Sequence, residues 1–168
     1  MAQNESFRWF DRLGKGDIKR KIAVTGAVHA GKTTRLKAMF YELASVGIEA
    51  AGFVEEAVFE GERRVGYDFV DVVTGEHCVV ARKRVDGEKY SFCEEAWGWA
   101  EARLRASEGK SVLIIDELGR LEGHGEGLMP GLKLSIMSAP RHVIASVRCD
   151  VLERIESQIG FFDEVIVV

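Results

Sequence analysis

The segment at residues 26–33 constrains the fold more than any other part of this chain. It reads Gly-Ala-Val-His-Ala-Gly-Lys-Thr, a complete match to the phosphate-binding pattern Gly-x-x-x-x-Gly-Lys-[Ser/Thr]. The run before it, 21–25, is strand-like, and the run after it, 32–46, has apolar residues at helical spacing and is closed by Gly47. Because the pattern needs a strand before it and a helix after it, this setting supports a true phosphate-binding loop.

The expected chemistry of the loop follows from its backbone. Glycines let the chain curl with its N–H groups pointing inward, and the start of the helix adds the positive end of a dipole. We therefore expect the loop to hold the phosphate tail of a nucleotide. The predicted contact residues are Gly26, Ala27, Val28, His29, Ala30, Gly31, Lys32, Thr33 and Thr34. Within this set, His29 is expected either to touch the γ-phosphate or to cap the loop.

Length and charge set broad limits. A chain of 168 residues is long enough for one domain with one core, and we divide it into a lead segment, 1–20, and a single domain, 21–168. The formal net charge of −4 argues against a broad nucleic-acid surface, although it leaves room for a local basic patch.

The three cysteines predict a reducing environment. Cys78, Cys93 and Cys149 are widely spaced, odd in number and form no Cys-x-x-Cys pair, so we interpret them as reduced thiols rather than disulfide or metal ligands. The longest apolar runs are the size of strands, and the start of the chain lacks the apolar core of a signal peptide. We therefore expect a cytoplasmic protein without a membrane span.

The lead segment mixes aromatic and apolar residues with charges. Phe7, Trp9, Phe10 and Leu13 could form a short helix laid on the domain, or belong to a poorly ordered lead with a hinge at 14–16. Aromatic residues rarely remain in water without a reason, so a loosely docked segment is favoured. Such a segment could also serve as a binding site for a protein partner.

Strand and helix patterns alternate along the domain. Strands are predicted at 21–25, 50–59, 65–69, 76–82, 90–92, 112–115, 141–147 and 164–168, and helices at 32–46, 94–107, 127–137 and 150–159. Asp150 is the expected N-cap of the last helix. Turns between the strands of 52–82 predict an antiparallel meander inserted after the first helix. The whole pattern predicts an α/β fold with a mainly parallel central sheet flanked by helices.

Two acids complete the expected chemistry. The apolar strand 112–115 is followed directly by Asp116 and Glu117. In proteins with such a loop, the first acid holds Mg²⁺, usually through water, and the loop hydroxyl, here Thr33, is a ligand of the same ion. Lys32 is expected to reach the β- and γ-phosphates. Glu117 is the candidate to orient and deprotonate an attacking water; a solvated carboxylate at a strand end is the alternative.

A longer stretch adds a family resemblance. Residues 116–122 read Asp-Glu-Leu-Gly-Arg-Leu-Glu, and 51–56, 61–69 and 74–75 form further motifs in a matching order. Together with the loop, these resemble the small P-loop nucleoside-triphosphatases described from thermophiles and, in humans, as a cancer-related nucleoside-triphosphatase. The resemblance spans roughly 21–148. It implies a P-loop NTPase fold, a magnesium requirement and hydrolysis of ATP, GTP and other nucleoside triphosphates with loose base preference.

Three further charged side chains are candidates for the same site. The resemblance would place Glu56 near the phosphates, whereas a plain strand-edge carboxylate fits its position equally well. Arg120 follows the Asp-Glu-Leu-Gly run and could act as an internal arginine finger, or form a surface salt bridge. Arg148 follows the strand 141–147, where a polar sensor of the γ-phosphate often lies in such folds.

The sequence therefore favours a magnesium-dependent nucleoside triphosphatase, and two alternatives stay open. The first is a small-molecule or nucleoside kinase, which needs an acceptor pocket and a basic lid. The second is a nucleotide-gated adaptor with little catalysis, such as a helper in cofactor assembly. No Asn-Lys-x-Asp motif is present, so GTP specificity of the signalling type has no support.

Overall fold

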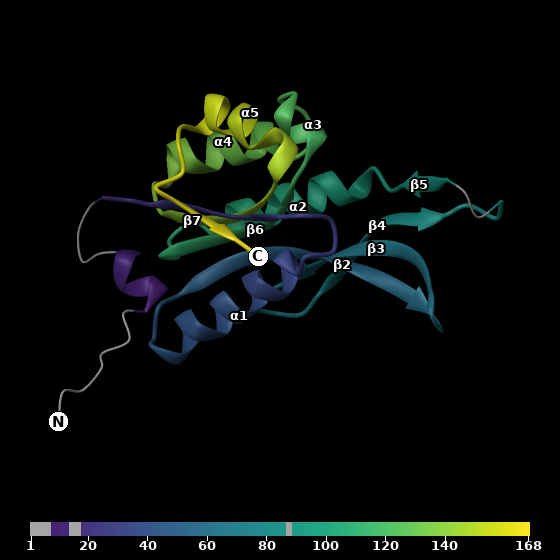
Figure 1. Cartoon of the computed structure of the whole chain (residues 1–168), viewed down its shortest axis with the longest axis horizontal. Coiled ribbons are helices and arrows are strands. Elements are labelled where there is room, and N and C mark those ends of the chain that lie inside the picture. The colour runs from purple at the N-terminus through teal and green to yellow at the C-terminus, as the bar shows by residue number, and fades with distance from the viewer. Residues whose placement is uncertain (1–7, 14–17, 87–88) are drawn as a thin grey trace.

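Eight strands and several helices make up the computed structural model, which describes residues 8–13, 18–86 and 89–168 (Figure 1). The strands are β1 (Lys21–Gly26), β2 (Ala50–Glu60), β3 (Arg63–Asp71), β4 (His77–Lys83), β5 (Tyr90–Phe92), β6 (Val112–Leu118), β7 (His142–Arg148) and β8 (Glu164–Val167). The α-helices are α1 (Lys32–Ser45), α2 (Glu95–Ala106), α3 (Arg120–Gly123), α4 (Met129–Ser138) and α5 (Leu152–Ile159). Two 3₁₀ helices, η1 (Trp9–Leu13) and η2 (Cys149–Val151), complete the described elements.

All eight strands join in one sheet, in the order β5-β4-β3-β2-β6-β7-β1-β8. Strands β2, β6, β7, β1 and β8 run parallel, and β3, β4 and β5 continue the sheet antiparallel from β2. This arrangement confirms the predicted α/β fold with a parallel centre and an antiparallel meander. The loop at 26–33 follows β1, so the carboxyl ends of the parallel strands form the edge at which a ligand is expected.

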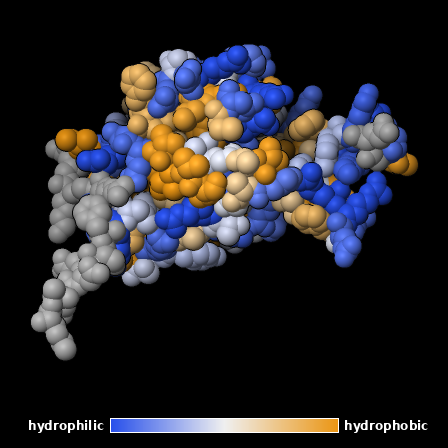
Figure 2. Space-filling view, viewed as in Figure 1, coloured by the Kyte–Doolittle hydropathy of each residue, from blue (hydrophilic) through white to orange (hydrophobic). Residues whose placement is uncertain are grey.

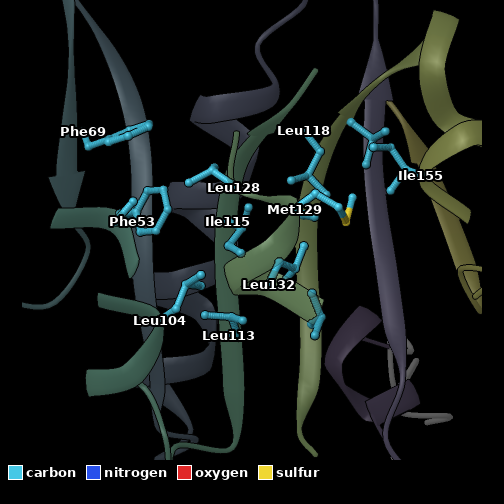
Figure 3. Packing of buried hydrophobic residues seen from close by; sticks show 14 of the residues in the cluster. Phe53, Phe69, Leu104, Leu113, Ile115, Leu118, Leu128, Met129, Leu132 and Ile155 are labelled. Carbon is cyan, nitrogen blue, oxygen red and sulfur yellow. The ribbon is translucent and has the colours of Figure 1, made fainter. Parts of the chain in front are cut away.

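Alternation along the central strands divides the core into two layers. On one face, Ile22, Val24 and Ile114 pack under α1, which contributes Leu36 and Met39. The other face is covered by α2, α4 and α5 (Figure 1). Figure 3 shows this second layer, in which Phe53 and Phe69 lie on the side of Leu104 and Leu128, and Met129 lies between Leu118 and Leu132. Because both faces are covered, the central strands are apolar over most of their length.

One glycine is required inside the sheet. A Cβ atom on Gly52 would lie 1.8 Å from the backbone oxygen of Ile114 on the neighbouring β6. No side chain fits at that distance, so glycine lets β2 approach β6 closely where the parallel core meets the meander.

The described part of the lead segment is a short helix on the outside of α1. In η1, Phe10 and Leu13 are buried in the same cluster as Leu43, and the Trp9 indole donates a hydrogen bond to Glu42. The prediction of a short helix laid on the domain is therefore confirmed for residues 9–13. Phe7 and the proposed hinge at 14–16 lie outside the described residues. A partner-binding role for the lead and the division at residue 20 stay predictions.

Three local expectations were wrong. The apolar strand predicted at 112–115 continues past Asp116 and Glu117 to Leu118, so the two acids lie within β6 and do not end it. A four-residue helix, α3, follows it where no element was expected. Asp150 is not an N-cap: α5 begins at Leu152 without a side-chain cap, and the carboxylate of Asp150 instead binds two arginines.

The surface has distinct hydrophilic and apolar regions. Figure 2 shows mostly hydrophilic side chains on the protruding end of the meander and an apolar patch near the middle of the same face. Cys78, Cys93 and Cys149 are free cysteines. Within the described ranges, no helix has the length and apolar character needed to cross a membrane.

Candidate active site

A cleft of about 590 Å³ opens at the carboxyl edge of the parallel strands. It lies between the loop after β1, the ends of β6 and β7, and the second half of β2. Its lining residues are Val28, His29, Gly31, Lys32, Thr33, Thr34, Lys37, Glu55, Glu56, Ala57, Phe59, Arg64, Tyr67, Glu117 and Arg148. Six of the nine predicted loop residues line the cleft. The other three, Gly26, Ala27 and Ala30, lie behind them in the same loop.

The loop has the tight backbone that the pattern predicts. Gly31, at the start of α1, has φ of 95°, and His29 has φ of 65°, both in the left-handed region. The Ala30 N–H donates to the Ala27 carbonyl oxygen, which closes the turn. The buried Lys32 curls over the loop, and its Nζ lies 3.1 Å from the same carbonyl oxygen. Lys32 therefore holds a positive charge against the loop.

Thr33 and Asp116 meet as the sequence predicts. The Thr33 hydroxyl donates a hydrogen bond of 2.6 Å to Asp116 Oδ2, and the same oxygen accepts the Glu55 N–H at 3.2 Å. The Ser146 hydroxyl on β7 donates to Asp116 Oδ1. Burial raises the pKa of Asp116, and these donors oppose that effect by binding its charged form. Four elements thus fix one carboxylate beside the loop.

Two more carboxyl groups face the same region. Burial, followed by the charge of Asp116, raises the pKa of Glu117. Burial raises the pKa of Glu55 to about 8, and the negative charges of Asp116 and Glu117 add to the effect. At neutral pH, Glu55 is therefore mainly protonated and can donate a hydrogen bond into the cleft. Sequence reasoning gave Glu55 no role and did not anticipate this environment.

The donor set fits magnesium. Mg²⁺ prefers oxygen ligands and in nucleotide sites is held by one or two protein groups together with phosphate oxygens and water. Thr33 Oγ1 and Asp116 Oδ2 supply such oxygens side by side. Among the residues that the structure describes, no group of three His, Cys, Asp or Glu side chains could hold a metal alone. A metal here would therefore depend on the nucleotide for its remaining ligands.

Arg148, rather than Arg120, lines the cleft. Because β7 lies between β1 and β6, with Gly26 opposite Arg148, this arginine stands between the loop and the acids. Its Nε and Nη2 donate to the two carboxylate oxygens of Asp150 at 3.0 and 3.1 Å. Arg120 is well exposed and reaches the same Asp150 at 3.4 Å from outside the cleft. The structure therefore shows the surface salt bridge that was the alternative for Arg120.

Glu56 is paired within the cleft wall. Its carboxylate lies 2.6 Å from Lys37 Nζ on α1, so it links β2 to the helix that follows the loop. Farther along the wall, Phe59, Arg64 and Tyr67 line the outer end. Sequence reasoning assigned none of these three a role. Their positions depend on the register between β2 and β3, which the sequence does not display.

The buried Glu122 supports the turn that follows the acids. Its carboxylate accepts the Gly119 N–H at 2.9 Å and the Leu128 N–H at 3.0 Å. It thereby ties the end of β6 to the start of α4. The sequence contained a signal for this role of Glu122. An acid three residues after the residue that precedes a helix has the spacing of a capping box.

The parallel sheet and the loop between β1 and α1 define a class, the P-loop nucleotide-binding proteins. Comparison with known proteins narrows this class. A family model described as NTPase matches residues 21–164, so the chain belongs to that family, and the resemblance drawn from its motifs is confirmed.

Similar proteins agree. The nucleoside-triphosphatase THEP1 of Ignicoccus hospitalis is 35% identical over 102 residues, which is 60% of this chain and 60% of that protein. The THEP1 protein of Pyrobaculum aerophilum is 34% identical over 131 residues, covering 76% of this chain and 73% of that protein. Several relatives are therefore matched over only about three fifths of their length.

A solved structure shares the fold. The solution structure of a human cancer-related nucleoside triphosphatase superimposes with a TM-score of 0.68 at 24% identity, covering 88% of this chain and 87% of that one. At this identity the likeness concerns the architecture alone. It agrees with the sheet of parallel strands flanked by helices and extended by antiparallel strands.

Proposed function

We propose that the protein is a magnesium-dependent nucleoside triphosphatase that releases the γ-phosphate of ATP, GTP and related nucleotides. The observation that carries this proposal is the meeting of Lys32, Thr33 and Glu117 in one cleft, with the buried Asp116 hydrogen-bonded to Thr33 beside it. The family and the names of its relatives support the same reaction. Free thiols support a cytoplasmic location, because thiols persist in reducing compartments.

The geometry suggests how each group acts. Loop N–H groups and Lys32 bind the β- and γ-phosphate oxygens, and Lys32 exchanges its carbonyl partners for them. Thr33 and Asp116 would hold Mg²⁺, which offsets the charge of these oxygens when bound. Glu117 orients a water in line with the γ-phosphorus and accepts its proton. The bond to the nucleoside diphosphate breaks as the new P–O bond forms, releasing inorganic phosphate.

Arg148 is the better placed of the two arginines to stabilise the transition state. It lines the cleft between the loop and the acids, whereas Arg120 is turned toward Asp150 on the outside. We infer that Arg148, positioned by Asp150, binds oxygen atoms of the γ-phosphoryl group as charge develops there. The sequence-based expectation for Arg120 thus becomes a competing hypothesis for the same role.

The assignment of Glu117 is tested with Glu117→Gln. This change keeps the shape of the side chain and removes its ability to accept a proton, so kcat should fall about 100-fold or more. The measurement is phosphate release from ATP with and without Mg²⁺, alongside the affinity for a non-hydrolysable ATP analogue, which should change little.

Glu126→Gln is the matched control, because Glu126 is exposed and lies outside the cleft. Undiminished phosphate release by the Glu117 variant would remove this residue as the base. Glu55→Gln then tests the other carboxyl group near Asp116, which can accept a proton only in the minority of molecules where it is ionised at neutral pH. Absence of phosphate release by the unmodified protein with every nucleotide tested would overturn the proposed function itself.

A further inference from the structure

The cleft continues beyond the loop and the acids, along the second half of β2 and the start of β3. Three side chains line this outer end: Phe59, Arg64 and Tyr67. We refer to these three residues as the aromatic shelf. The reaction proposed above uses none of them, although they belong to the same continuous cleft.

A β-bulge brings the three side chains to one face. Ala57 pairs with Tyr67, and Phe59 pairs with Arg64, so β3 carries one extra residue between the two pairs. Residues 57 and 59 share a face of β2, and their partners therefore share it too. In a regular strand, the odd spacing of Arg64 and Tyr67 would place them on opposite faces. The bulge is thus what assembles the aromatic shelf.

The aromatic shelf presents the Phe59 ring to solvent beside the half-buried Arg64 and Tyr67, whose ring also contacts Tyr90. The Arg64 guanidinium lies 5.2 Å from the centroid of the Tyr67 ring, a cation–π contact that holds it over that ring. Phe59 is 57% exposed, which leaves much of its ring without a protein neighbour. The cleft therefore ends in an open phenyl face beside an arginine plane and a tyrosine.

We propose that the aromatic shelf binds a nucleobase. Aromatic rings and arginine planes are the surfaces on which proteins stack bases, and such stacking accepts every base because each has a π-face. Strand geometry places Phe59 about 13 Å along β2 from Glu55, so a base on the shelf leaves the loop free for phosphates. The cleft volume of about 590 Å³ lies within the usual range for small-molecule sites.

This inference rests on the proposed function only for its assumption that phosphates occupy the loop. The base on the shelf has two possible sources. One is the base of the substrate itself, in which case the shelf accounts for loose base preference. The other is a second nucleoside that binds while a triphosphate occupies the loop. The chemistry recognised is the same, and binding measurements distinguish the two.

The experiment is isothermal titration calorimetry in Mg²⁺ with three probes: a non-hydrolysable ATP analogue, inorganic tripolyphosphate, and adenosine added to protein saturated with tripolyphosphate. Phe59→Ala and Tyr67→Ala are compared with the unmodified protein. If the substrate's own base uses the shelf, both variants bind the analogue at least about fivefold more weakly and bind tripolyphosphate normally. If a second nucleoside uses it, the variants keep analogue affinity but lose adenosine binding by a similar factor.

Two controls separate stacking from damage to the fold. Tyr67→Phe keeps the ring and should bind like the unmodified protein. Phe92→Ala removes another exposed aromatic ring of the meander, outside the cleft, and should have no effect. Normal binding of all three probes by both shelf variants would overturn the inference. Failure of the unmodified protein to bind both the ATP analogue and tripolyphosphate would instead contradict the proposed function. Titration with adenosine alone would then still test the aromatic shelf.

Discussion

At the scale of single residues, Asp116 shows how the chain keeps a carboxylate inside an apolar sheet. The residue is 1% exposed, and burial alone would favour its protonated form. Donors from Thr33, Ser146 and the Glu55 backbone surround its two oxygens. They come from different strands and a helix, so the fold itself sets the position of the carboxylate. A charge held in this way needs little rearrangement when a cation binds.

Arg148→Ala tests the proposal that Arg148 stabilises the transition state. Loss of this guanidinium should lower kcat for ATP about tenfold or more, because it removes positive charge from the transferring phosphoryl group. KM should change less, since the proposed mechanism assigns ground-state binding to Lys32 and the loop N–H groups. The measurement is steady-state phosphate release, with trapping of ADP and aluminium fluoride as a readout of transition-state binding.

Arg120→Ala is the comparison for this test. Its guanidinium is exposed and reaches only Asp150 among the described contacts, so kcat should remain near that of the unmodified protein. A large loss of kcat in the Arg120 variant with none in the Arg148 variant would identify Arg120 as the arginine finger. It would contradict the role proposed for Arg148.

Motif residues could be predicted from the sequence because short-range chemistry fixes them. Lys32 and Thr33 follow from the loop pattern, and Asp116 from its place after an apolar strand. Glu55 and Tyr67 could not be assigned in the same way. The environment of Glu55 depends on the neighbouring β6, and the orientation of Tyr67 depends on a bulge, and neither feature leaves a local signature.

At the scale of elements, α3 and the turn before it carry the next prediction. Glu122→Ala should destabilise the fold by about 2 kcal/mol or more, because it leaves the Gly119 and Leu128 N–H groups without their partner. The measurement is urea unfolding followed by circular dichroism. Glu126→Ala, an exposed acid in the same connection, provides the baseline. Equal stabilities of the two variants would show that the turn does not depend on the buried carboxylate.

The long elements could be predicted, and so could the short strands β5 and β8, whereas the short helix α3 could not. The period of apolar residues located α1 within a residue of its observed end, and turn residues located β3 and β4. The four residues of α3 are too few to show any period. Asp150 is a residue type that often caps helices, yet its carboxylate binds Arg148, two residues before it, and Arg120, thirty residues before it. One local and one tertiary contact outweighed the capping preference there.

At the scale of the whole molecule, a buried histidine lies at the end of the parallel strands opposite the cleft. His142 begins β7 and is 7% exposed, and its Nδ1 accepts the Arg20 N–H at 3.0 Å. Burial lowers the pKa of His142, and the nearby charges of Lys19 and Arg20 lower it further, while Asp163 opposes them. The folded protein therefore disfavours the protonated ring, which also cannot accept this hydrogen bond.

The sign of the resulting pH dependence follows from proton counting. Below the unfolded-state pKa of about 6.5, the unfolded chain binds a proton at His142 that the folded chain resists, so the free energy of unfolding falls as pH decreases through this range. Above it, the contribution is fully present. His142→Asn keeps an acceptor for Arg20 but does not titrate, so its loss of stability between pH 7 and pH 5 should be smaller. Urea unfolding at both pH values measures this difference, with His124→Asn, at an exposed position, as the control. Parallel slopes for the His142 variant and the unmodified protein would show that the buried ring does not contribute.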